Sequence, residues 1–149
     1  MLEILFTRLN DVAQVPCYAH PGDAACDLVA CVDVDIAPLG RARVGTGLAL
    51  EIPSGYAGLV LPRSGLATKH GITLANSPGL IDSGYRGEII VALFNSDATT
   101  SYSVKSGDRI AQLLLMAIPT VSFSEAASLS RSDRGAGGFG STGLGSLAT

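Results

Sequence analysis

The chain has 149 residues, of which 47% are hydrophobic and 15% are charged, and its formal net charge at pH 7 is −3. This length suits one domain with its own hydrophobic core, and the acidic balance argues against a protein that binds duplex DNA or RNA through a basic surface. The mean hydropathy of +0.38 is high for a soluble monomer and suggests apolar surface buried between subunits.

Neither the N-terminus nor the apolar runs predict a membrane protein. No charged-then-apolar leader opens the chain, and the longest apolar run, at residues 113–118, is too short to span a bilayer. The cysteines lack C-x-x-C spacing, and we expect buried thiols in a reducing compartment at Cys17, Cys26 and Cys31. We therefore expect a cytoplasmic protein that binds neither nucleic acid nor membrane.

Short apolar runs separated by Gly, Pro and Asp extend along most of the chain. We expect strands over residues 2–9, 26–36, 43–52, 56–61, 72–76, 87–95, 100–105 and 109–118. Strands at such spacing indicate an all-β barrel or sandwich. One very short helix is expected over residues 64–71, capped by Ser64 and ended by Gly71. Within a single domain, we expect a β-barrel body over 1–119, a connector over 120–133 and a flexible glycine-rich lid over 134–149.

The junction between a strand and this helix, LPRSGLATKHG at residues 61–71, has the properties of an anion site. Free backbone N–H groups and the helix dipole favour anions at such a junction, and the guanidinium of Arg63 suits phosphate. A plain helix cap beside a surface arginine explains the same residues equally well, so this segment alone leaves both interpretations open.

The segment NSPGLIDSGYRGE at residues 76–88 predicts the elaborate tip of a β-hairpin. Such a tip brings Asn76, Asp82 and Tyr85 together and exposes backbone groups that can bind the edge of a nucleobase. Tyr85 could cover one side of a sugar, and Asp82 could orient and deprotonate a water molecule. The more ordinary interpretation is that Asn76 and Asp82 satisfy turn backbone, which these residue types often do.

The glycine-rich segment RGAGGFGSTG at residues 134–143 contains the pattern G-x-G-x-x-G. The context argues against a dinucleotide site, because neither the segment before the glycines nor the segment after them reads as the strand and helix that such a site needs. A flexible terminal tail is common. However, the arginine, the aromatic residue and the Ser-Thr pair suit a loop that closes over an anion and stacks on a flat group.

Five segments taken in sequence order resemble the signature motifs of the trimeric dUTPase family. They are GDAACDL, PRSGLATKHG, NSPGLIDSGYRGE, GDRIAQL and RGAGGFGSTG, and the resemblance covers residues 3–143. The second, third and fifth motifs are specific, whereas the first and fourth would mean little alone. The amino-acid sequence of these motifs is most similar to that of actinobacterial enzymes.

The resemblance implies a homotrimer of jelly-roll-like β-clip barrels with three active sites at subunit interfaces. The C-terminal segment of one subunit would close a site that its neighbours build. The implied reaction is the Mg²⁺-assisted hydrolysis of dUTP to dUMP and pyrophosphate. This reaction limits uracil incorporation into DNA and supplies dUMP for dTMP synthesis.

The resemblance also implies a role for each matched residue. Asp82 would be the general base that activates the water attacking the α-phosphorus. Mg²⁺ would lie mainly on the triphosphate, and Asp27 would reach it through water. The uracil and deoxyribose would contact Asn76, Gly79, Leu80, Ile81, Asp82, Tyr85 and the stacking ring of Phe139. The phosphates would contact Arg63, Ser64, Gly65, Gln112, Arg134, Gly140, Ser141 and Thr142.

Two small departures from the family pattern and two alternative functions remain. Ala136 takes a variable position in the fifth motif. Ile90 lies where some bacterial relatives carry a lysine, so one charged contact near the site is absent. A dCTP deaminase shares the fold but needs a glutamate placed to activate water at the base. A non-catalytic nucleotide-binding regulator on the same fold is the other alternative. The aspartate in the IDSGYRGE context favours phosphohydrolysis.

Overall fold

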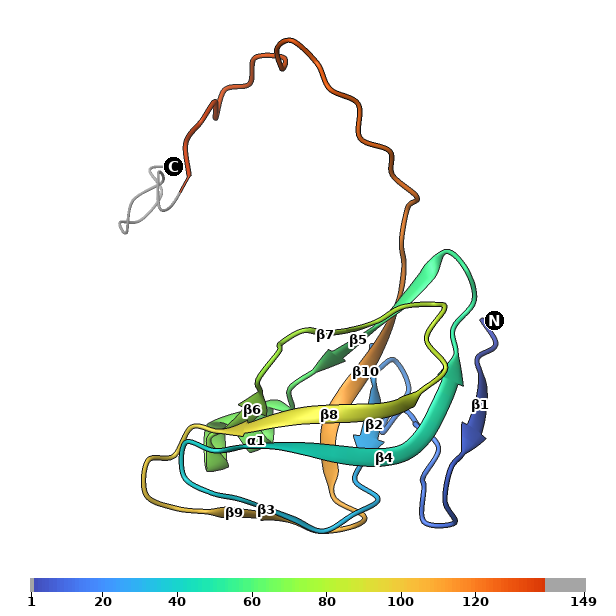
Figure 1. The fold of residues 1–149 in the computed structure, drawn as a ribbon, viewed down its shortest axis with the longest axis vertical. Coiled ribbons are helices and arrows are strands. Elements are labelled where there is room, and N and C mark those ends of the chain that lie inside the picture. The colour runs from blue at the N-terminus through green and yellow to red at the C-terminus, as the bar shows by residue number, and fades with distance from the viewer. Residues whose placement is uncertain (1, 139–149) are drawn as a thin grey trace.

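A computed structural model describes residues 2–138 of the chain (Figure 1). Its helix is α1 (Ser64–His70). Its strands are β1 (Leu5–Arg8), β2 (Cys26–Val29), β3 (Val34–Ile36), β4 (Arg41–Glu51), β5 (Tyr56–Leu61), β6 (Ile72–Leu74), β7 (Gly79–Ile81), β8 (Glu88–Asn95), β9 (Tyr102–Val104) and β10 (Arg109–Ala117).

The strands of the described residues form two four-stranded sheets and one two-stranded pair, all antiparallel. The strand orders are β1-β4-β8-β6 and β2-β10-β5-β7, and β3 pairs with β9. One core joins all three, since Val44 and Val91 of the first sheet pack in the same cluster as Leu28 and Leu113 of the second and Val104 of β9. The expected all-β, jelly-roll-like body with one short helix is confirmed.

Strand β8 shows how the sequence pattern builds this core. Its residues alternate between partly exposed and buried, with Ile89, Val91 and Leu93 facing inward. The last inward position is Asn95, which is fully buried. Its amide donates to the carbonyl of Thr100 at 2.8 Å and its Oδ1 accepts from the N–H of Asp97 at 3.0 Å. Because its polar atoms are paired, Asn95 fixes the turn after β8 without an uncompensated burial cost.

The short helix differs from the sequence prediction at its first residue and agrees with it at its end. The prediction that Ser64 caps the helix is wrong: Ser64 is the first helical residue, and the capping position belongs to Arg63, whose side chain makes no capping bond. The prediction for Gly71 is confirmed, since it has φ 65° and its N–H bonds the carbonyl of Ala67. Within residues 2–138 there is no helix long and apolar enough to cross a membrane.

Two predicted elements divide between sheets. The run at residues 26–36 is two strands, because β2 pairs with β10 whereas β3 pairs with β9. The hairpin of β6 and β8 is present, with Leu74 opposite Leu93. Between them, however, the chain crosses to the second sheet, where β7 pairs with β5 and Gly79 lies opposite Val60. The predicted hairpin tip is therefore a crossover that holds the two sheets together at one edge.

Beyond β10 the chain leaves the body. Figure 1 shows the chain after Ala117 arching away from the sheets, and through residue 138 it forms neither helix nor strand. Phe123 and Leu129 on this segment are 97% and 90% exposed. An extended chain with bare apolar side chains is suited to packing against a surface outside its own body.

The cysteines are free, but their burial differs from the expectation. Cys31 is buried and Cys26 is partly buried, whereas Cys17 is exposed. The prediction of a buried thiol is therefore wrong at Cys17, because this residue lies in the irregular segment between β1 and β2 and pairs only through an isolated bridge with Asp27.

Candidate functional site

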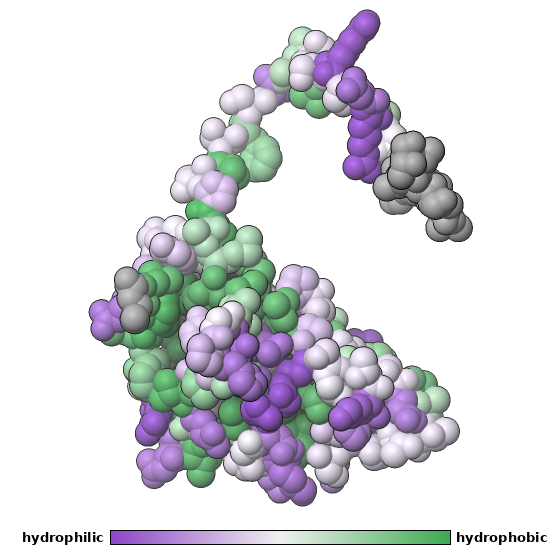
Figure 2. All heavy atoms as spheres, turned by 180° about the vertical axis from the view of Figure 1, so that it is seen from behind, coloured by the Kyte–Doolittle hydropathy of each residue, from purple (hydrophilic) through white to green (hydrophobic). Residues whose placement is uncertain are grey.

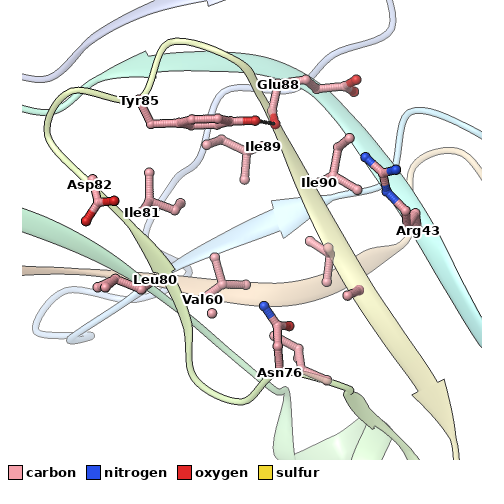
Figure 3. A pocket seen from close by; sticks show the side chains of 14 residues that line it. Arg43, Val60, Asn76, Leu80, Ile81, Asp82, Tyr85, Glu88, Ile89 and Ile90 are labelled. Carbon is pink, nitrogen blue, oxygen red and sulfur yellow. Dashed lines mark hydrogen bonds between the residues drawn. The ribbon is translucent and has the colours of Figure 1, made fainter.

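A cleft of about 320 Å³ opens between β7 and β8 (Figure 3). Strand β7 is the edge of its sheet, and β8 pairs with β6 only over residues 93–95. Two strand edges with unpaired backbone groups therefore face this cleft. Its lining side chains include Val60, Leu74, Ile81, Ile89 and Val91 on the floor, and Asn76, Asp82, Tyr85, Glu88 and Arg43 at the rim. An apolar floor with a few polar groups at the rim suits a flat ring with a polar edge.

Asp82 lies directly after β7, at the rim of this cleft. Its backbone carbonyl accepts the N–H of Tyr85 at 3.0 Å, which closes the turn. Its exposed carboxylate makes no hydrogen bond or ion pair with any residue from 2 to 138. The side chain of Asn76 is likewise without a hydrogen-bond partner in this range. Neither side chain is thus used to satisfy turn backbone, and both are available to a ligand.

The ring of Tyr85 forms one wall of the cleft. Its hydroxyl donates to the carbonyl of Glu88 at 3.0 Å, as Figure 3 shows. A Cβ on Gly87 would lie 2.5 Å from that hydroxyl oxygen, so glycine is required for the ring to lie where it does. The carboxylate of Glu88 accepts the N–H of Gly47 at 2.8 Å. This hydrogen bond joins the wall of the cleft to β4, so the carboxylate of Glu88 has a structural role.

Arg86 braces the same segment from outside. Its guanidinium donates to the carbonyls of Ser83 at 2.6 Å and Tyr85 at 2.9 Å. It also pairs with Glu51 at 3.4 Å. These bonds brace the turn after β7 that carries Asp82.

A second cluster lies on the neighbouring strands, in a hollow of about 480 Å³. Its centre is Asp27 on β2, which is only 8% exposed. One carboxylate oxygen accepts from Nε of Arg63 and the other from an Nη atom of Arg109, each at 3.1 Å. Arg63 also donates to the carbonyl of Arg109 at 3.1 Å. Gln112 on β10 lies opposite Asp27 and lines the same hollow.

Within this cluster one carboxylate lies between two guanidinium groups, which leaves one positive charge available to an anion. The carboxylate of Asp23 lines the same hollow and offsets that charge. Asp27 also holds both arginines in place, because burial makes charge-assisted hydrogen bonds strong and the loss of one partner costly. Arg109 lies within the motif GDRIAQL at residues 107–113, but no role was predicted for it from the sequence.

The other predicted residues lie apart from both hollows. Ser64 and Gly65 are exposed at the start of α1. Arg134 is exposed on the extended chain, where its Nε donates to the carbonyl of Gly137 at 2.8 Å. The predicted residues Phe139, Gly140, Ser141 and Thr142 lie outside the described residues. The structure thus brings together, in one cleft, the described residues that were predicted to contact the base and the sugar, and Asp27, Arg63 and Gln112 in another.

The described residues offer little to hold a metal ion by themselves. No group of three or more His, Cys, Asp or Glu side chains in this part of the chain has the arrangement of a metal site. Each oxygen of Asp27 accepts one hydrogen bond from an arginine and keeps a second lone pair. Asp27 therefore suits a water-mediated contact with a cation that the ligand carries, and not direct coordination.

Comparison with known proteins gives consistent matches. A family model, dUTPase, matches residues 11–143. The deoxyuridine 5'-triphosphate nucleotidohydrolase of Thermobifida fusca is 54% identical over 136 residues, which are 91% of this chain and 76% of the relative. The protein of the same name from Cutibacterium acnes is 47% identical over 147 residues, 99% of this chain and 97% of the relative. The solved structure of Staphylococcus bacteriophage 80alpha dUTPase with dUPNHPP has a TM-score of 0.90 and 28% identity, and the match covers 97% of this chain and 100% of that one.

Proposed function

The chain belongs to the dUTPase family, and from this premise we propose that it is a dUTP diphosphatase that hydrolyses dUTP to dUMP and pyrophosphate. Its similar relatives come from actinobacteria, in line with the resemblance of its motifs. The observation that carries the proposal is the carboxylate of Asp82, which has no partner among residues 2–138 and lies at the rim of an apolar cleft between two open strand edges.

The cleft between β7 and β8 receives the uracil and the sugar. The backbone of Gly79, Leu80 and Ile81 and the amide of Asn76 pair with the polar edge of the base. The ring of Tyr85 packs against the deoxyribose, held there by its bond to Glu88. Cytosine would reverse a donor and an acceptor and leave buried groups unpaired, at a cost of about 1–3 kcal/mol each.

Asp82 is the general base. It takes a proton from a water molecule whose oxygen attacks the α-phosphorus, the bond from that phosphorus to the bridging oxygen breaks, and pyrophosphate leaves. A positioned base contributes roughly 10²–10⁴-fold to such a reaction. Neutralising the phosphate charge must supply much of the rest, because phosphoryl transfer depends mainly on positioning and electrostatics.

The phosphates of the nucleotide contact the second cluster and the C-terminal segment. Arg63 and Gln112 contact phosphate oxygens together with Ser64 and Gly65, and Asp27 keeps Arg63 oriented. The C-terminal lid adds Phe139 stacked on uracil, and Arg134, Gly140, Ser141 and Thr142 on the phosphates.

Because Asp82 and Arg63 line separate hollows of one subunit, we propose that a complete site combines groups from several copies in a homotrimer. Apolar surface supports this assembly. Leu5 and Phe6 of β1 are exposed, and Figure 2 shows apolar side chains gathered on the body where the C-terminal chain leaves it. The extended chain after Ala117 then reaches a neighbouring subunit.

Mg²⁺ is the proposed cofactor, bound mainly by the triphosphate with Asp27 contacting it through water. A divalent cation on the phosphates neutralises charge that develops during transfer. We also propose a cytoplasmic location, in line with the free cysteines Cys17, Cys26 and Cys31. There the reaction limits uracil incorporation into DNA and supplies dUMP for dTMP synthesis.

A dCTP deaminase is disfavoured by a specific contact. The carboxylates that line the base cleft within residues 2–138 are Asp82 and Glu88. Glu88 is bonded to the backbone of Gly47 at 2.8 Å, so it is not free to activate water at a base. A non-catalytic regulator would not need a free carboxylate such as Asp82.

Pyrophosphate release from dUTP with Mg²⁺ tests the proposal. The wild type should release pyrophosphate, and Asp82→Asn should lose this activity with an unchanged melting temperature, because the side chain has no partner among the described residues. Full activity of Asp82→Asn would exclude Asp82 as the base. Release of ammonia from dCTP would favour the deaminase instead.

A further inference from the structure

Residues 20–23, with the sequence HPGD, form a tight turn in the irregular segment between β1 and β2. The N–H of Asp23 donates to the carbonyl of His20 at 3.2 Å, which closes the turn. Pro21 and Gly22 occupy its two central positions, and Gly22 has φ 92°, a value that glycine adopts readily and other residues rarely do. This local sequence therefore holds the two ends of the turn in a fixed relation. The proposed mechanism does not use this turn.

The imidazole of His20 is oriented by the carboxylate at the other end of the turn. Oδ2 of Asp23 accepts the backbone N–H of His20 at 2.8 Å and lies 3.6 Å from Nδ1 of its ring, an ion-pair distance when the imidazole is protonated. The side chain of His20 is 82% exposed, and its Nε2 makes no hydrogen bond with any residue from 2 to 138. A protonated imidazole is a donor at both nitrogens, so Nε2 is available to an anion.

The turn lines the hollow around Asp27, to which the proposed function assigns the phosphates. Among the described residues, the side chains that line this hollow and carry a fixed charge are Asp23, Asp27, Arg63 and Arg109, and His20 lines it with them. The two carboxylates and the two guanidinium groups cancel, so the hollow has no net charge while His20 is neutral. Histidine gains its positive charge as the pH falls from 8 to 5. Protonation of His20 therefore gives the hollow a net positive charge, which favours a triphosphate.

The other titratable groups near the turn add no charge in this pH range. Tyr18 borders a shallow hollow together with His20. Electrostatic interaction and hydrogen bonding with Cys26 raise the pKa of Tyr18, and burial raises the pKa of the Cys26 thiol. Both side chains therefore stay neutral between pH 8 and 5, and the change of charge beside the phosphates falls to His20.

We propose that His20 is a further phosphate-binding residue, whose protonated imidazole donates from Nε2 to a phosphate oxygen of the substrate in the hollow around Asp27. This inference rests on the proposed function of that hollow. Asp23 holds the imidazole at the edge of the hollow, and the charge of His20 in turn offsets the carboxylate of Asp23. The contribution of His20 to triphosphate binding is therefore present in mild acid and lost as the pH rises.

Replacement of each histidine in turn tests this role. His20→Gln removes the charge, and the matched control is His70→Gln, which changes the other histidine of the chain, also exposed but outside the hollow. The probe is the imido analogue of dUTP with Mg²⁺, titrated calorimetrically near pH 6 and near pH 8. At the lower pH we expect His20→Gln to bind the probe roughly 3- to 10-fold more weakly than wild type, as for one charged contact open to water. At the higher pH the two should bind alike, and His70→Gln should match wild type throughout.

Two further measurements separate the charge of His20 from a general effect on the fold. His20→Lys keeps a positive charge throughout this range, so it should bind the probe more tightly than His20→Gln at both pH values. Deoxyuridine, which carries no phosphate, should bind equally to wild type and His20→Gln. A matching loss for deoxyuridine, a loss for the probe that does not change with pH, or the same loss in His70→Gln would each overturn the role of His20.

Failure of the proposed function gives a different result. Should the wild type release no pyrophosphate from dUTP, the proposed reaction fails. Inorganic tripolyphosphate then tests His20 without the nucleotide. Wild type should still bind tripolyphosphate more tightly than His20→Gln near pH 6, and equal binding at this pH overturns the inference.

Discussion

The ring of Tyr85 lies across Gly87 so closely that a single methyl group at position 87 would come within 2.5 Å of the tyrosine hydroxyl oxygen. Two residues of the loop between β7 and β8, separated by one position, thus define one wall of the cleft between these strands. The bond from the hydroxyl to the carbonyl of Glu88 depends on this packing.

Gly87→Ala should therefore displace the Tyr85 ring and reduce activity. We expect kcat/KM for dUTP to fall by at least tenfold, because a displaced ring no longer holds the substrate in the geometry that the reaction requires. The control is Gly84→Ala in the same loop, where a Cβ would meet nothing within 4 Å. Steady-state kinetics of both variants, with melting temperatures, make the comparison. Similar kinetics for both would show that the Tyr85 wall is not needed.

Asp27→Asn should destabilise the fold. The carboxylate is 8% exposed and pairs with both Arg63 and Arg109, so its removal leaves two guanidinium groups facing a neutral amide. Breaking a buried pair costs about 3–5 kcal/mol, and we expect less here because the Arg109 side chain is 55% exposed. Chemical denaturation measures the loss.

Asp33→Asn is the matched control for this loss. Asp33 also pairs with a cation, Lys105, at 3.1 Å and accepts the N–H of Ser106 at 2.8 Å, but the side chains of this pair lie at the surface. Exposed pairs contribute little to stability, so the effect should be much smaller than at Asp27. If the two variants lost equal stability, the cluster around Asp27 would not act as a buried unit.

Local patterns predicted part of this structure well. The alternation of Ile89, Val91 and Leu93 predicted β8 to within one residue at its start. Strand β7 was missed, because a three-residue strand is defined by its pairing with β5 and not by its own sequence. The same reason explains why the run at 26–36 was not divided between two sheets.

The candidate site likewise contains residues that a local sequence pattern predicted and residues that depend on the pairing of distant strands. Asn76, Asp82 and Tyr85 were predicted together because they belong to one contiguous segment. The triad of Asp27, Arg63 and Arg109 depends on the pairing of β2, β10 and β5, and its register is not encoded in any single segment.

Stability should fall in acid partly through Asp97. Backbone N–H groups of Thr99 and Thr100 donate to its carboxylate, and these bonds lower its pKa, with Thr99 the larger cause. A carboxyl whose folded pKa is lowered stabilises the fold above its unfolded pKa, near 4, and loses that contribution as pH falls through the folded value.

Asp97→Ala should accordingly be less stable than wild type at pH 7, and the difference should shrink as the pH falls below about 4. Denaturation midpoints measured from pH 7 to pH 3 provide the check. A difference between the two proteins that stayed constant across this range would mean that the charge of Asp97 does not contribute.

Removal of residues 134–149 should abolish most activity without loss of the folded body. Over residues 134–138 the hydrogen bonds stay inside the segment and its neighbour Ser132, such as Arg134 to Gly137 and Gly135 to Ser132, and none reaches the sheets. The melting temperature of the truncated protein should therefore match that of the full chain. Turnover of dUTP should fall because Arg134 and the stacking ring of Phe139 are absent.

Phe139→Ala in the full chain separates the stacking contribution from the rest of the lid. Its affinity for dUTP should fall by about 1–3 kcal/mol, the range for a base stacked on an aromatic side chain. Calorimetric titration with the nucleotide on the Asp82→Asn background avoids turnover during the measurement.

If the truncated protein were unfolded, the segment would belong to the body and not to a lid. If Phe139→Ala bound dUTP as tightly as its parent, the uracil would be held by the cleft between β7 and β8 alone.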